Sequence, residues 1–375
     1  MTMKVYADHA ATTKLDTDAF EAMKPFLLND FGNASQPYSF ARTAKVALKS
    51  ARITIANCIN ANPEEIYFTS GGTESDNWAI KSPSLIDRDN GTTITSQIEH
   101  HAVLHACHAV ERIGNHVVYL PVDSQGIVQF DTLSNHLSDS TRLVSIMFAN
   151  NEIGTVQPIK KLCEITHSKG ALFHTDAVQA VGHILIDVKE LNVDMLSASA
   201  HKFNGPKGIG FLYIKKGTPI LPYVDGGAQE FGMRAGTENV ASIVAMAVAL
   251  EKNCNRMHSV NDHLIELEHK LLTSLQIAGL DFIRNGSCDR IPGNMSLSFR
   301  GSEGEMLLHR LDLMGISVST GSACDSKNTQ LSHVLKAIHT PSEYANGTIR
   351  ISLGYENTDE EISYIAASLI KILQR

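Results

Sequence analysis

The sequence predicts an α/β protein in which a mainly parallel, seven-stranded sheet is flanked by helices and followed by a smaller α+β domain. Two observations support this prediction. Short apolar runs of strand length alternate with helical patterns between residues 66 and 214, an arrangement that is typical of parallel strands. The apolar periodicity then changes near residue 258. The seven predicted strands are 66–69, 92–95, 117–120, 143–148, 172–175, 195–199 and 210–214.

The segments that flank the sheet complete the predicted architecture. An extended segment, VYADHAATTKL, precedes a predicted helix over 16–28, and the turn-rich stretch FGNASQPYSF leads to a second helix over 42–60. A long helical pattern later carries the chain into the smaller domain. The predicted large domain is therefore 13–258, and the smaller one is 1–12 with 259–375. The smaller domain contains predicted strands at 295–299, 316–319 and 348–353 and helices at 305–314 and 359–374.

Composition indicates an ordinary soluble globular protein. The chain is 43% hydrophobic, and its 40 acidic and 32 basic residues give a formal charge of -8, which argues against a dedicated nucleic-acid surface. MTMKVYADHA lacks the apolar core of a signal peptide, and the longest apolar run, 240–250, is too short to span a bilayer. We expect a cytoplasmic protein without a membrane segment. The six cysteines show no metal-ligand spacing, so we expect no metal site.

Polar clusters follow five of the predicted strands. They are SGGTES (70–75), QIEHH (97–101), ANNEIG (149–154), DAVQ (176–179) and the pair at 201–202. Ligands of such sheets bind beyond the carboxyl ends of the strands. The sequence therefore predicts a binding site along this edge, and a plain domain with solvated loops does not easily explain five clusters there.

Lys202 and Asp176 are the residues of this edge for which a chemical role is easiest to assign. A partly desolvated lysine beside other cationic groups becomes a nucleophile that can form a Schiff base, although a lysine before a glycine-rich loop is more often only solvated. Asp176 either caps the next turn or, if buried, keeps a ring nitrogen protonated so that the ring accepts electrons.

Two further clusters lie at predicted helix starts. SGGTES places free backbone N–H groups where an anion such as phosphate can bind, although Gly-Gly-Thr is also a common helix cap. In HHAVLHACHAV, we expect only His101, at the start of the helix, to be near the edge of the sheet. The other histidines of this helix are expected on the surface or in packing contacts.

Arg350 and Cys324 are candidate site residues of the smaller domain. The alternation of TIRISLG turns Arg350 away from the small core, where it is either solvated or holds a substrate carboxylate by two hydrogen bonds. Cys324 lies in VSTGSACDSKNTQ, which offers no apolar neighbours to bury it. An accessible thiol near Lys327 can carry thiolate character and attack sulfur.

Taken together, these motifs resemble those of the cysteine desulfurases, which are fold-type I, class V aminotransferase-like enzymes with pyridoxal 5'-phosphate (PLP). The similarity is greatest to the group with a long active-site loop carrying SGSAC. It covers nearly the whole chain and rests on DHAATT, FTSGGTESDN, NNEIGTVQPI, HTDAVQA, SASAHKFNGPKGIG, GMRAGTEN, STGSACDS and IRISLG. The resemblance implies a homodimer and PLP as the cofactor.

The resemblance also implies roles for individual residues. Lys202 forms the Schiff base with PLP, Asp176 pairs with the pyridinium nitrogen, and His101 stacks on the ring. Gln179 and Asn151 lie by the ring hydroxyl and the substrate. The phosphate is implied to be held by Gly72, Thr73, Ser199 and His201, with Thr237 added from the other subunit.

The implied reaction removes sulfur from L-cysteine. Arg350 and Asn151 hold the substrate carboxylate, Lys202 moves the α proton, and His101 takes the thiol proton. Cys324 then receives the sulfur as a persulfide, which leaves L-alanine as the product. The persulfide passes to an acceptor protein that serves iron-sulfur assembly, tRNA thiolation or DNA phosphorothioation.

Some features depart from the family's pattern or leave alternatives open. Ala200, Asn204 and Tyr38 differ from residues that are common in the family, and the chain ends at Arg375, without the tail by which housekeeping members dock an iron-sulfur scaffold. This makes the other acceptors as plausible as the scaffold. The alternative functions are a selenocysteine lyase or aminotransferase on the same fold, and a catalytically silent sulfur-carrier subunit.

Overall fold

The computed structural model describes residues 3–86, 91–320 and 331–374. Cys324 and Lys327 lie outside these residues, so the structure does not test the predictions made for them. In the described part of the chain, no helix has the length and apolar character needed to cross a membrane, and no three His, Cys, Asp or Glu side chains are grouped so that they could hold a metal ion.

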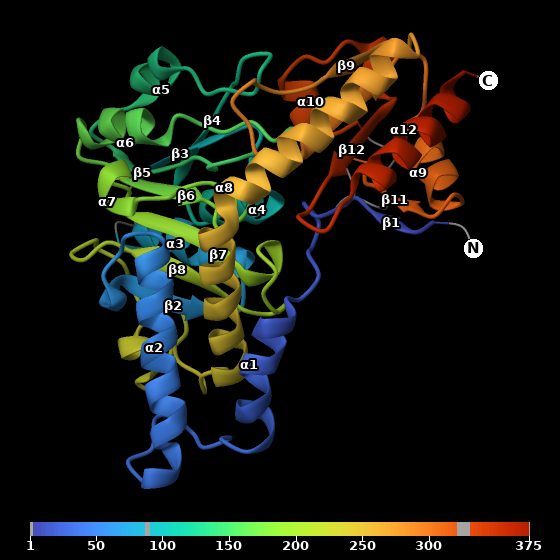
Figure 1. The fold of residues 1–375 in the computed structure, drawn as a ribbon. Helices are drawn as coiled ribbons and strands as arrows, with labels where there is room; N and C mark the ends of the chain where they lie inside the picture. The colour runs from blue at the N-terminus through green and yellow to red at the C-terminus, as the bar shows by residue number, and fades with distance from the viewer. Residues whose placement is uncertain (1–2, 87–90, 321–330, 375) are drawn as a thin grey trace.

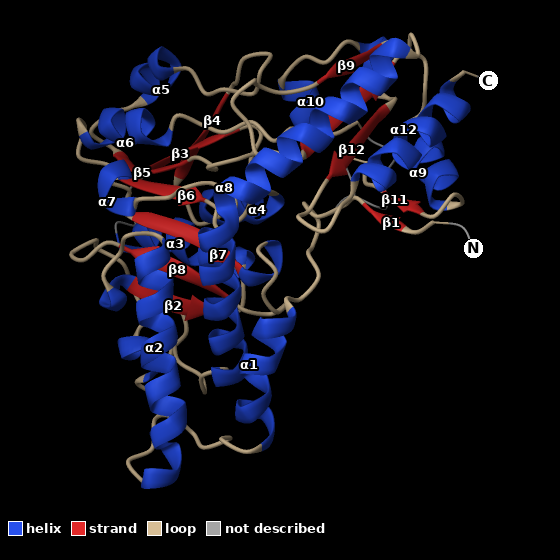
Figure 2. Cartoon of the chain, in the orientation of Figure 1, coloured by secondary structure: helices blue, strands red, loops and turns tan. Residues whose placement is uncertain are grey.

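The predicted α/β fold is confirmed by a seven-stranded sheet with the strand order β2-β8-β7-β6-β5-β3-β4 (Figure 2). All neighbouring strands are parallel except β8, which is antiparallel to both β2 and β7. Its strands are β2 (Ile66–Thr69), β3 (Thr92–Ser96), β4 (His116–Leu120), β5 (Thr141–Ser145), β6 (Leu172–Asp176), β7 (Met195–Ser199) and β8 (Gly210–Ile214).

Both faces of the sheet are buried, which explains why its strands are nearly continuous apolar runs. Neighbouring side chains point to opposite faces, so Met195 and Leu196 of β7 belong to two different hydrophobic clusters. One face is covered by α3 (Gly72–Ile86) and α4 (His101–Glu111). The other face packs against α2 (Arg42–Cys58), α5 (Phe130–His136), α6 (Ile159–His167), α7 (Val188–Leu191) and the first half of α8 (Val240–Ile277).

A second, smaller core lies beside the sheet unit (Figure 1). Its three-stranded antiparallel sheet has the order β12-β10-β9, and a separate parallel pair joins β1 to β11. The N-terminal strand therefore belongs with the C-terminal part of the chain. The elements of this small unit are β1 (Val5–Tyr6), β9 (Phe282–Arg284), β10 (Asn294–Phe299), α9 (Gly304–Asp312), β11 (Ile316–Ser317), α11 (Ser342–Ala345), β12 (Thr348–Ser352) and α12 (Asp359–Leu373). The short helix α10 (His333–Ala337) instead packs Val334 and Leu335 into the core of the large sheet.

The long helix α8 connects the two cores. It begins at an Asn239 cap, whose side chain accepts a hydrogen bond from the backbone N–H of Ser242. Leu250 near its start packs into the core of the large sheet, whereas Leu264 and Leu271 pack into the second core. The exact domain limits, 13–258 and 1–12 with 259–375, stay a prediction. Near its start, α8 packs beside α1 (Thr17–Leu28) and α2, which extend away from the sheet.

Candidate active site

A cavity of about 390 Å³ lies at the carboxyl ends of the central strands. The large sheet unit supplies most of its walls, and Arg350 of β12 closes it from the small unit. It is lined by Ala10, Ala11, Gly72, Thr73, Asp76, His100, Met147, Ala149, Asn151, Asp176, Val178, Gln179, Ser199, His201, Lys202 and Arg350. Nine of the residues predicted from the sequence meet here: Gly72, Thr73, Asn151, Asp176, Gln179, Ser199, His201, Lys202 and Arg350.

Lys202 ends a short 3-10 turn that directly follows β7. Its Nζ donates hydrogen bonds to the carbonyl oxygens of Ala10 (2.6 Å) and Ala11 (2.8 Å). The N-terminal segment therefore holds the amine at the cavity wall, although the two are separated by about 190 residues in the sequence. Gln179 donates to the same Ala10 carbonyl (3.0 Å), so one peptide orients two cavity side chains.

Asp176 is the last residue of β6 and is only 5% exposed. Its Oδ1 accepts a hydrogen bond from the backbone N–H of Val178 (2.9 Å). Burial raises the pKa of Asp176 to about 6, because a carboxylate loses hydration there. A cationic group bound beside it would offset that cost, so the position suits a protonated ring nitrogen.

A second acid, Asp76, lines the same cavity and was missed in the sequence. It is 1% exposed, and its Oδ1 has no hydrogen-bond partner among the described residues. Burial, together with the nearby charge of Asp176, raises the pKa of Asp76 well above its ordinary value. The available signal was its spacing, because Asp76 lies one helical turn after Gly72 and thus on the same face of α3.

The first turn of α3 forms an anion cradle. The helix begins at Gly72, where a Cβ would lie only 2.5 Å from Val178 Cγ2, so only glycine fits. Free backbone N–H groups at this end favour a bound anion. Ser199 and His201 border the same space. Burial, aided by the Lys202 charge, lowers the pKa of His201 to about 4, so its ring is neutral at pH 7.

Of the two adjacent histidines at the start of α4, His100 lines the cavity, whereas the sequence predicted His101. His100 is the N-cap of α4, and its Nδ1 accepts a hydrogen bond from the backbone N–H of Ala102 (3.1 Å). Burial and the Lys202 charge lower the pKa of His100 to about 4, so the ring is neutral and its proton lies on Nε2. The His101 ring instead contacts the rings of His105 and His333, with centroid distances of 5.3 and 5.0 Å. The cap residue faces the cavity, and the helix starts one residue later.

Arg350 is buried at the boundary between the two units and lies 5% exposed. Its Nη2 donates to Asp8 Oδ1 (2.7 Å), and its Nη1 donates to the carbonyl oxygen of Asn151 (2.9 Å). Its Nε has no hydrogen-bond partner in the described part of the chain. The guanidinium therefore keeps a donor for a further acceptor, and Asp8 is a partner that the sequence did not indicate.

Of the other predicted site residues, Thr237 is exposed and is not one of the described residues that line this cavity. Cys324 lies outside the described residues.

The comparisons with known proteins place this arrangement in a class. The aminotransferase class-V model matches residues 5–365, and the chain therefore belongs to that family. Within it, the chain is 47% identical over 379 residues to the cysteine desulfurase IscS of Clostridium botulinum, a match that covers 100% of this chain and 96% of that protein. The predicted resemblance to cysteine desulfurases is thus confirmed.

Solved structures agree with this assignment. A NifS-like protein superposes with a TM-score of 0.93 at 39% identity, covering 99% of this chain and 100% of that chain. The structure of SspA in complex with cysteine superposes with a TM-score of 0.83 at 34% identity, covering 95% of this chain and 100% of that chain.

The cofactor of this class is PLP, as the resemblance predicted. The residues present fit it. Lys202 offers an amine, the first turn of α3 offers an anion cradle, and the buried Asp176, whose pKa burial raises to about 6, suits the protonated nitrogen of a pyridine ring.

Proposed function

We propose that the protein is a PLP-dependent cysteine desulfurase, which converts L-cysteine to L-alanine and collects the sulfur as a persulfide on Cys324. The observation that carries this proposal is the meeting of the Lys202 amine, the Asp176 carboxyl and the α3 anion cradle in one cavity. The names of the relatives support the reaction, and a similar structure holds cysteine. Selenocysteine lyase and aminotransferase activities on the same fold are the alternatives that these names do not favour.

The cavity residues would share the work as follows. Bound PLP supplies an electron sink that weakens the bonds at the substrate α carbon. Asp176 keeps the ring nitrogen protonated, and the first turn of α3, with Ser199 and His201, holds the phosphate. Lys202, whose amine lies at the wall of the same cavity, binds the cofactor and then moves the α proton.

Substrate binding would use the boundary between the two units. Arg350, which lines the cavity, binds the L-cysteine carboxylate through its guanidinium, whose Nη1 and Nη2 also donate to Asn151 and Asp8. His100 takes the place at the ring that was predicted for His101, and its Nε2–H can donate to the substrate. In this tautomer His100 acts as a donor, and a role as base for the thiol proton would require the ring to change tautomer.

The experiment compares three variants of the purified protein. In the presence of a reducing thiol, which releases the persulfide sulfur as sulfide, Cys324→Ser should keep the cofactor and abolish sulfide release from L-cysteine, whereas Lys202→Ala should lose both the visible absorbance of bound PLP and the activity. Lys207→Ala, which removes an exposed lysine five positions away, is the matched control and should leave both unchanged. Full sulfide release by Cys324→Ser would refute the desulfurase. A colourless wild-type protein would favour a silent sulfur-carrier subunit.

We also propose that the enzyme is a homodimer. Several large apolar side chains on and near α1 and α2 are exposed, and a groove of about 600 Å³ runs between these helices and the start of α8. Such a surface is typical of an interface with a second copy. The exposed Thr237 would then reach the partner's phosphate site. Light scattering on the purified protein gives the mass, and a monomer would refute this proposal.

The acceptor and the location are proposals of the same kind. An acceptor protein of iron-sulfur assembly, tRNA thiolation or DNA phosphorothioation would take the persulfide. The cytoplasm is supported by the described cysteines, Cys58, Cys107, Cys163, Cys254 and Cys288, which are all free thiols.

A further inference from the structure

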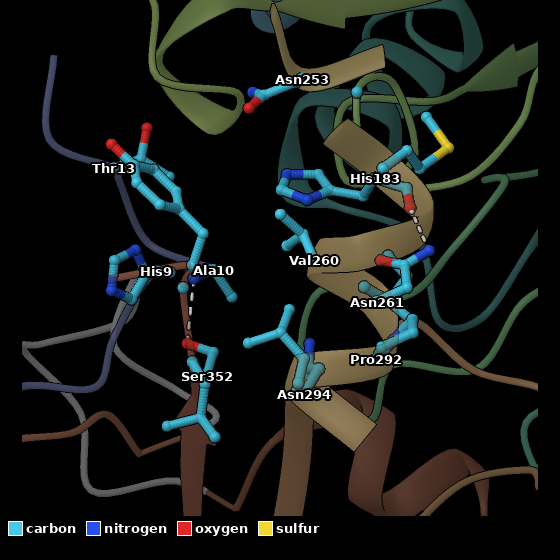
Figure 3. Close-up of a pocket in the computed structure, with 18 of the residues that line it drawn as sticks. His9, Ala10, Thr13, His183, Asn253, Val260, Asn261, Pro292, Asn294 and Ser352 are labelled. Atoms are coloured by element: carbon cyan, nitrogen blue, oxygen red, sulfur yellow. Dashed lines mark hydrogen bonds between the residues drawn. The ribbon is translucent and has the colours of Figure 1, made fainter. Parts of the chain in front are cut away.

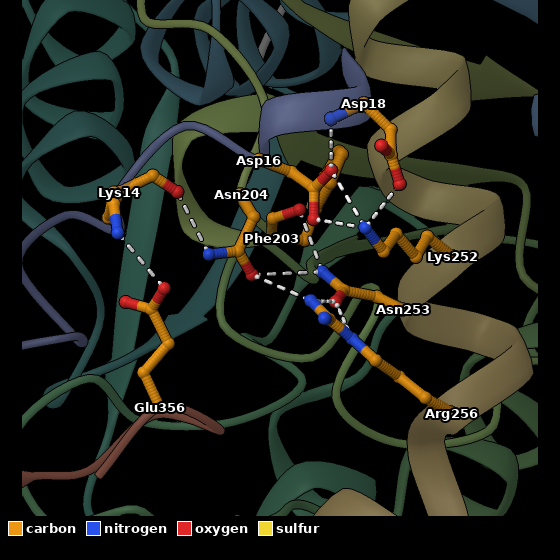
Figure 4. Close-up of polar contacts among 9 residues, drawn as sticks. All are labelled: Lys14, Asp16, Asp18, Phe203, Asn204, Lys252, Asn253, Arg256 and Glu356. Atoms are coloured by element: carbon orange, nitrogen blue, oxygen red, sulfur yellow. Dashed lines mark hydrogen bonds and ion pairs between the residues drawn. The ribbon is translucent and has the colours of Figure 1, made fainter. Parts of the chain in front are cut away.

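The two residues that follow Lys202 are held by a polar network to which the proposed chemistry assigns no role (Figure 4). Asn204 is buried and has a φ of +64°, a conformation that asparagine tolerates better than most residues. Its backbone N–H donates to Thr13 Oγ1 (2.8 Å), and its carbonyl oxygen accepts from the N–H of Asp16 (2.9 Å). The N-terminal segment thus fixes the backbone of this turn.

The side chain of Asn204 joins the turn to two other elements. Its Nδ2 donates to the carbonyl oxygen of Lys14 (2.9 Å), and its Oδ1 accepts from Asn253 Nδ2 (3.3 Å) and Arg256 Nη2 (3.4 Å). Asn253 also donates to the carbonyl oxygen of Phe203 (2.7 Å). Helix α8 therefore holds both residues directly after the lysine.

The carbonyl oxygen of Lys202 itself is fixed nearby. His183 Nε2 donates to it (2.9 Å), and the carbonyl oxygen of His183 accepts from Asn261 Nδ2 of α8 (3.1 Å). Burial lowers the pKa of His183, so its ring is neutral and can keep a single proton on Nε2 for this bond. The lysine turn is thus tied to α8 on both sides.

The same network reaches the small unit. The Arg256 guanidinium lies 3.7 Å from the centre of the Tyr355 ring, and Lys14 Nζ forms an ion pair with Glu356 (3.1 Å). Tyr355 and Glu356 lie in the segment after β12, the strand that carries Arg350. Because the guanidinium is planar, its stacking on the Tyr355 ring fixes the orientation of Arg256 as well as the position of its charge.

Packing alone does not fix this junction, because a cavity of about 50 Å³ separates the two sides (Figure 3). Asn204, Arg256 and Tyr355 all line it. In Figure 3, His183, Val260 and Asn261 lie on one side of the space, and His9 and Ser352 lie on the other. The polar contacts around Asn204 therefore cross a junction at which packing is incomplete, and they act beside the hydrogen bond from the Ala10 N–H to Ser352 Oγ (2.9 Å).

We propose that Asn204 is a positioning residue, which sets the Lys202 turn relative to Arg350 by joining the N-terminal segment, α8 and the segment after β12. This inference rests on the roles proposed above for Lys202 and Arg350. The reaction needs the amine and the substrate carboxylate in a fixed relation, and a misplacement of about 1 Å can cost about 100-fold in rate.

The test uses Asn204→Gly, because glycine adopts the positive φ without strain and removes only the side-chain hydrogen bonds. The expected result is a fall in kcat of about tenfold with PLP still bound, together with a shift in the pH dependence of the visible absorbance of the cofactor. Asn192→Gly is the matched control, since Asn192 also has a positive φ (+59°) but lies exposed at the end of α7. It should show wild-type kinetics and absorbance.

A second pair of variants tests the link to the small unit. Tyr355→Ala, which removes the stacking partner of Arg256, should raise KM for L-cysteine several-fold and leave the cofactor absorbance unchanged, whereas Tyr355→Phe keeps the ring and should match the wild type. Wild-type kcat, KM and absorbance in Asn204→Gly would overturn the inference, as would equal losses in Asn192→Gly. A wild-type protein without PLP absorbance or sulfide release would refute the proposed function instead.

Discussion

Two sides of the cavity are built in opposite ways: the acid side, with Asp176 and Asp76, and the amine side, with Lys202. On the amine side, Lys202 Nζ has two carbonyl acceptors, and the turn that carries it is hydrogen-bonded to Thr13 of the N-terminal segment, to Asn253 of α8 and to His183. On the acid side, Asp76 Oδ1 and Glu99 Oε2 have no hydrogen-bond partner in the described residues. The amine side is satisfied without a ligand, whereas the acid side carries an electrostatic cost that a cationic ligand relieves.

The acid side owes this cost to the fold. Asp176 and His174 of β6 point to the face of the sheet that α3 covers, where Asp76 and Glu99 are also buried. His174 is hydrogen-bonded to Ser145 (2.8 Å) and Ser197 (2.9 Å), and burial lowers its pKa to about 3. A neutral imidazole supplies no positive charge there. The difference between the two sides therefore predicts that changes on the acid side alter electrostatics, and that changes on the amine side alter geometry.

The largest effect is expected from Asp176→Asn, which keeps the size of the side chain and removes its charge. Without that charge the ring nitrogen of PLP is less often protonated, so the rate of sulfide release should fall by about 100-fold or more. Stopped-flow measurement of sulfide release, with the PLP content measured by absorbance, checks this. Asp187→Asn, at the half-buried N-cap of α7 and outside the residues that line the cavity, is the control and should keep wild-type activity. A fall of less than about threefold in Asp176→Asn would contradict the assigned role.

The next effect separates two neighbouring histidines. His100→Gln should lower kcat by about 100-fold, the lower end of what a positioned proton donor contributes. His101→Gln should stay within about twofold of the wild type, because the His101 ring does not line the cavity. Steady-state kinetics of both variants at saturating PLP provide the measurement. The reverse order of effects would restore the assignment predicted from the sequence.

The histidine case shows where sequence reasoning reaches its limit. The strands were predictable because a sheet buried on both faces needs apolar runs. Asp176 was found because it ends such a run, and Lys202 because it follows one closely. The choice between His100 and His101 depends on one backbone conformation: His100 has a ψ of 148°, which makes it the cap and turns its ring into the cavity. Either histidine was compatible with the sequence pattern.

Residues that act through tertiary contacts could not be predicted from the sequence for a different reason. Asp8 meets Arg350 across 342 positions, and Asp76 meets Asp176 only because α3 packs over β6. No local pattern encodes such a distance. The prediction that Arg350 points away from the small core was correct, but its burial against Asn151 follows from how the two units meet.

The smallest effect concerns the stability of the cofactor-free protein and its dependence on pH. Burial raises the pKa of Glu99 to about 8, so the folded state keeps a proton that the unfolded state loses above its ordinary pKa of 4.5. The folded state therefore binds more protons, and stability falls as the pH rises toward 8. His174, with its pKa lowered to about 3, acts in the opposite direction, but only below its ordinary value of 6.5. Between pH 6.5 and 8 the Glu99 contribution is thus unopposed by His174.

Glu99→Gln isolates this contribution. Gln can still accept at Oε1 from Ser96 Oγ and from the backbone N–H of Met147, as Glu99 does, but it does not titrate. Between pH 6.5 and 8 the unfolding free energy of the variant should fall by about 2 kcal/mol less than that of the wild type. Urea unfolding of both apoproteins across this range, with the exposed Glu64→Gln as control, gives the difference. If the unfolding free energies of the two proteins change equally with pH, Glu99 ionises at its ordinary pKa in the folded protein. The acid side would then carry no greater electrostatic cost than the amine side.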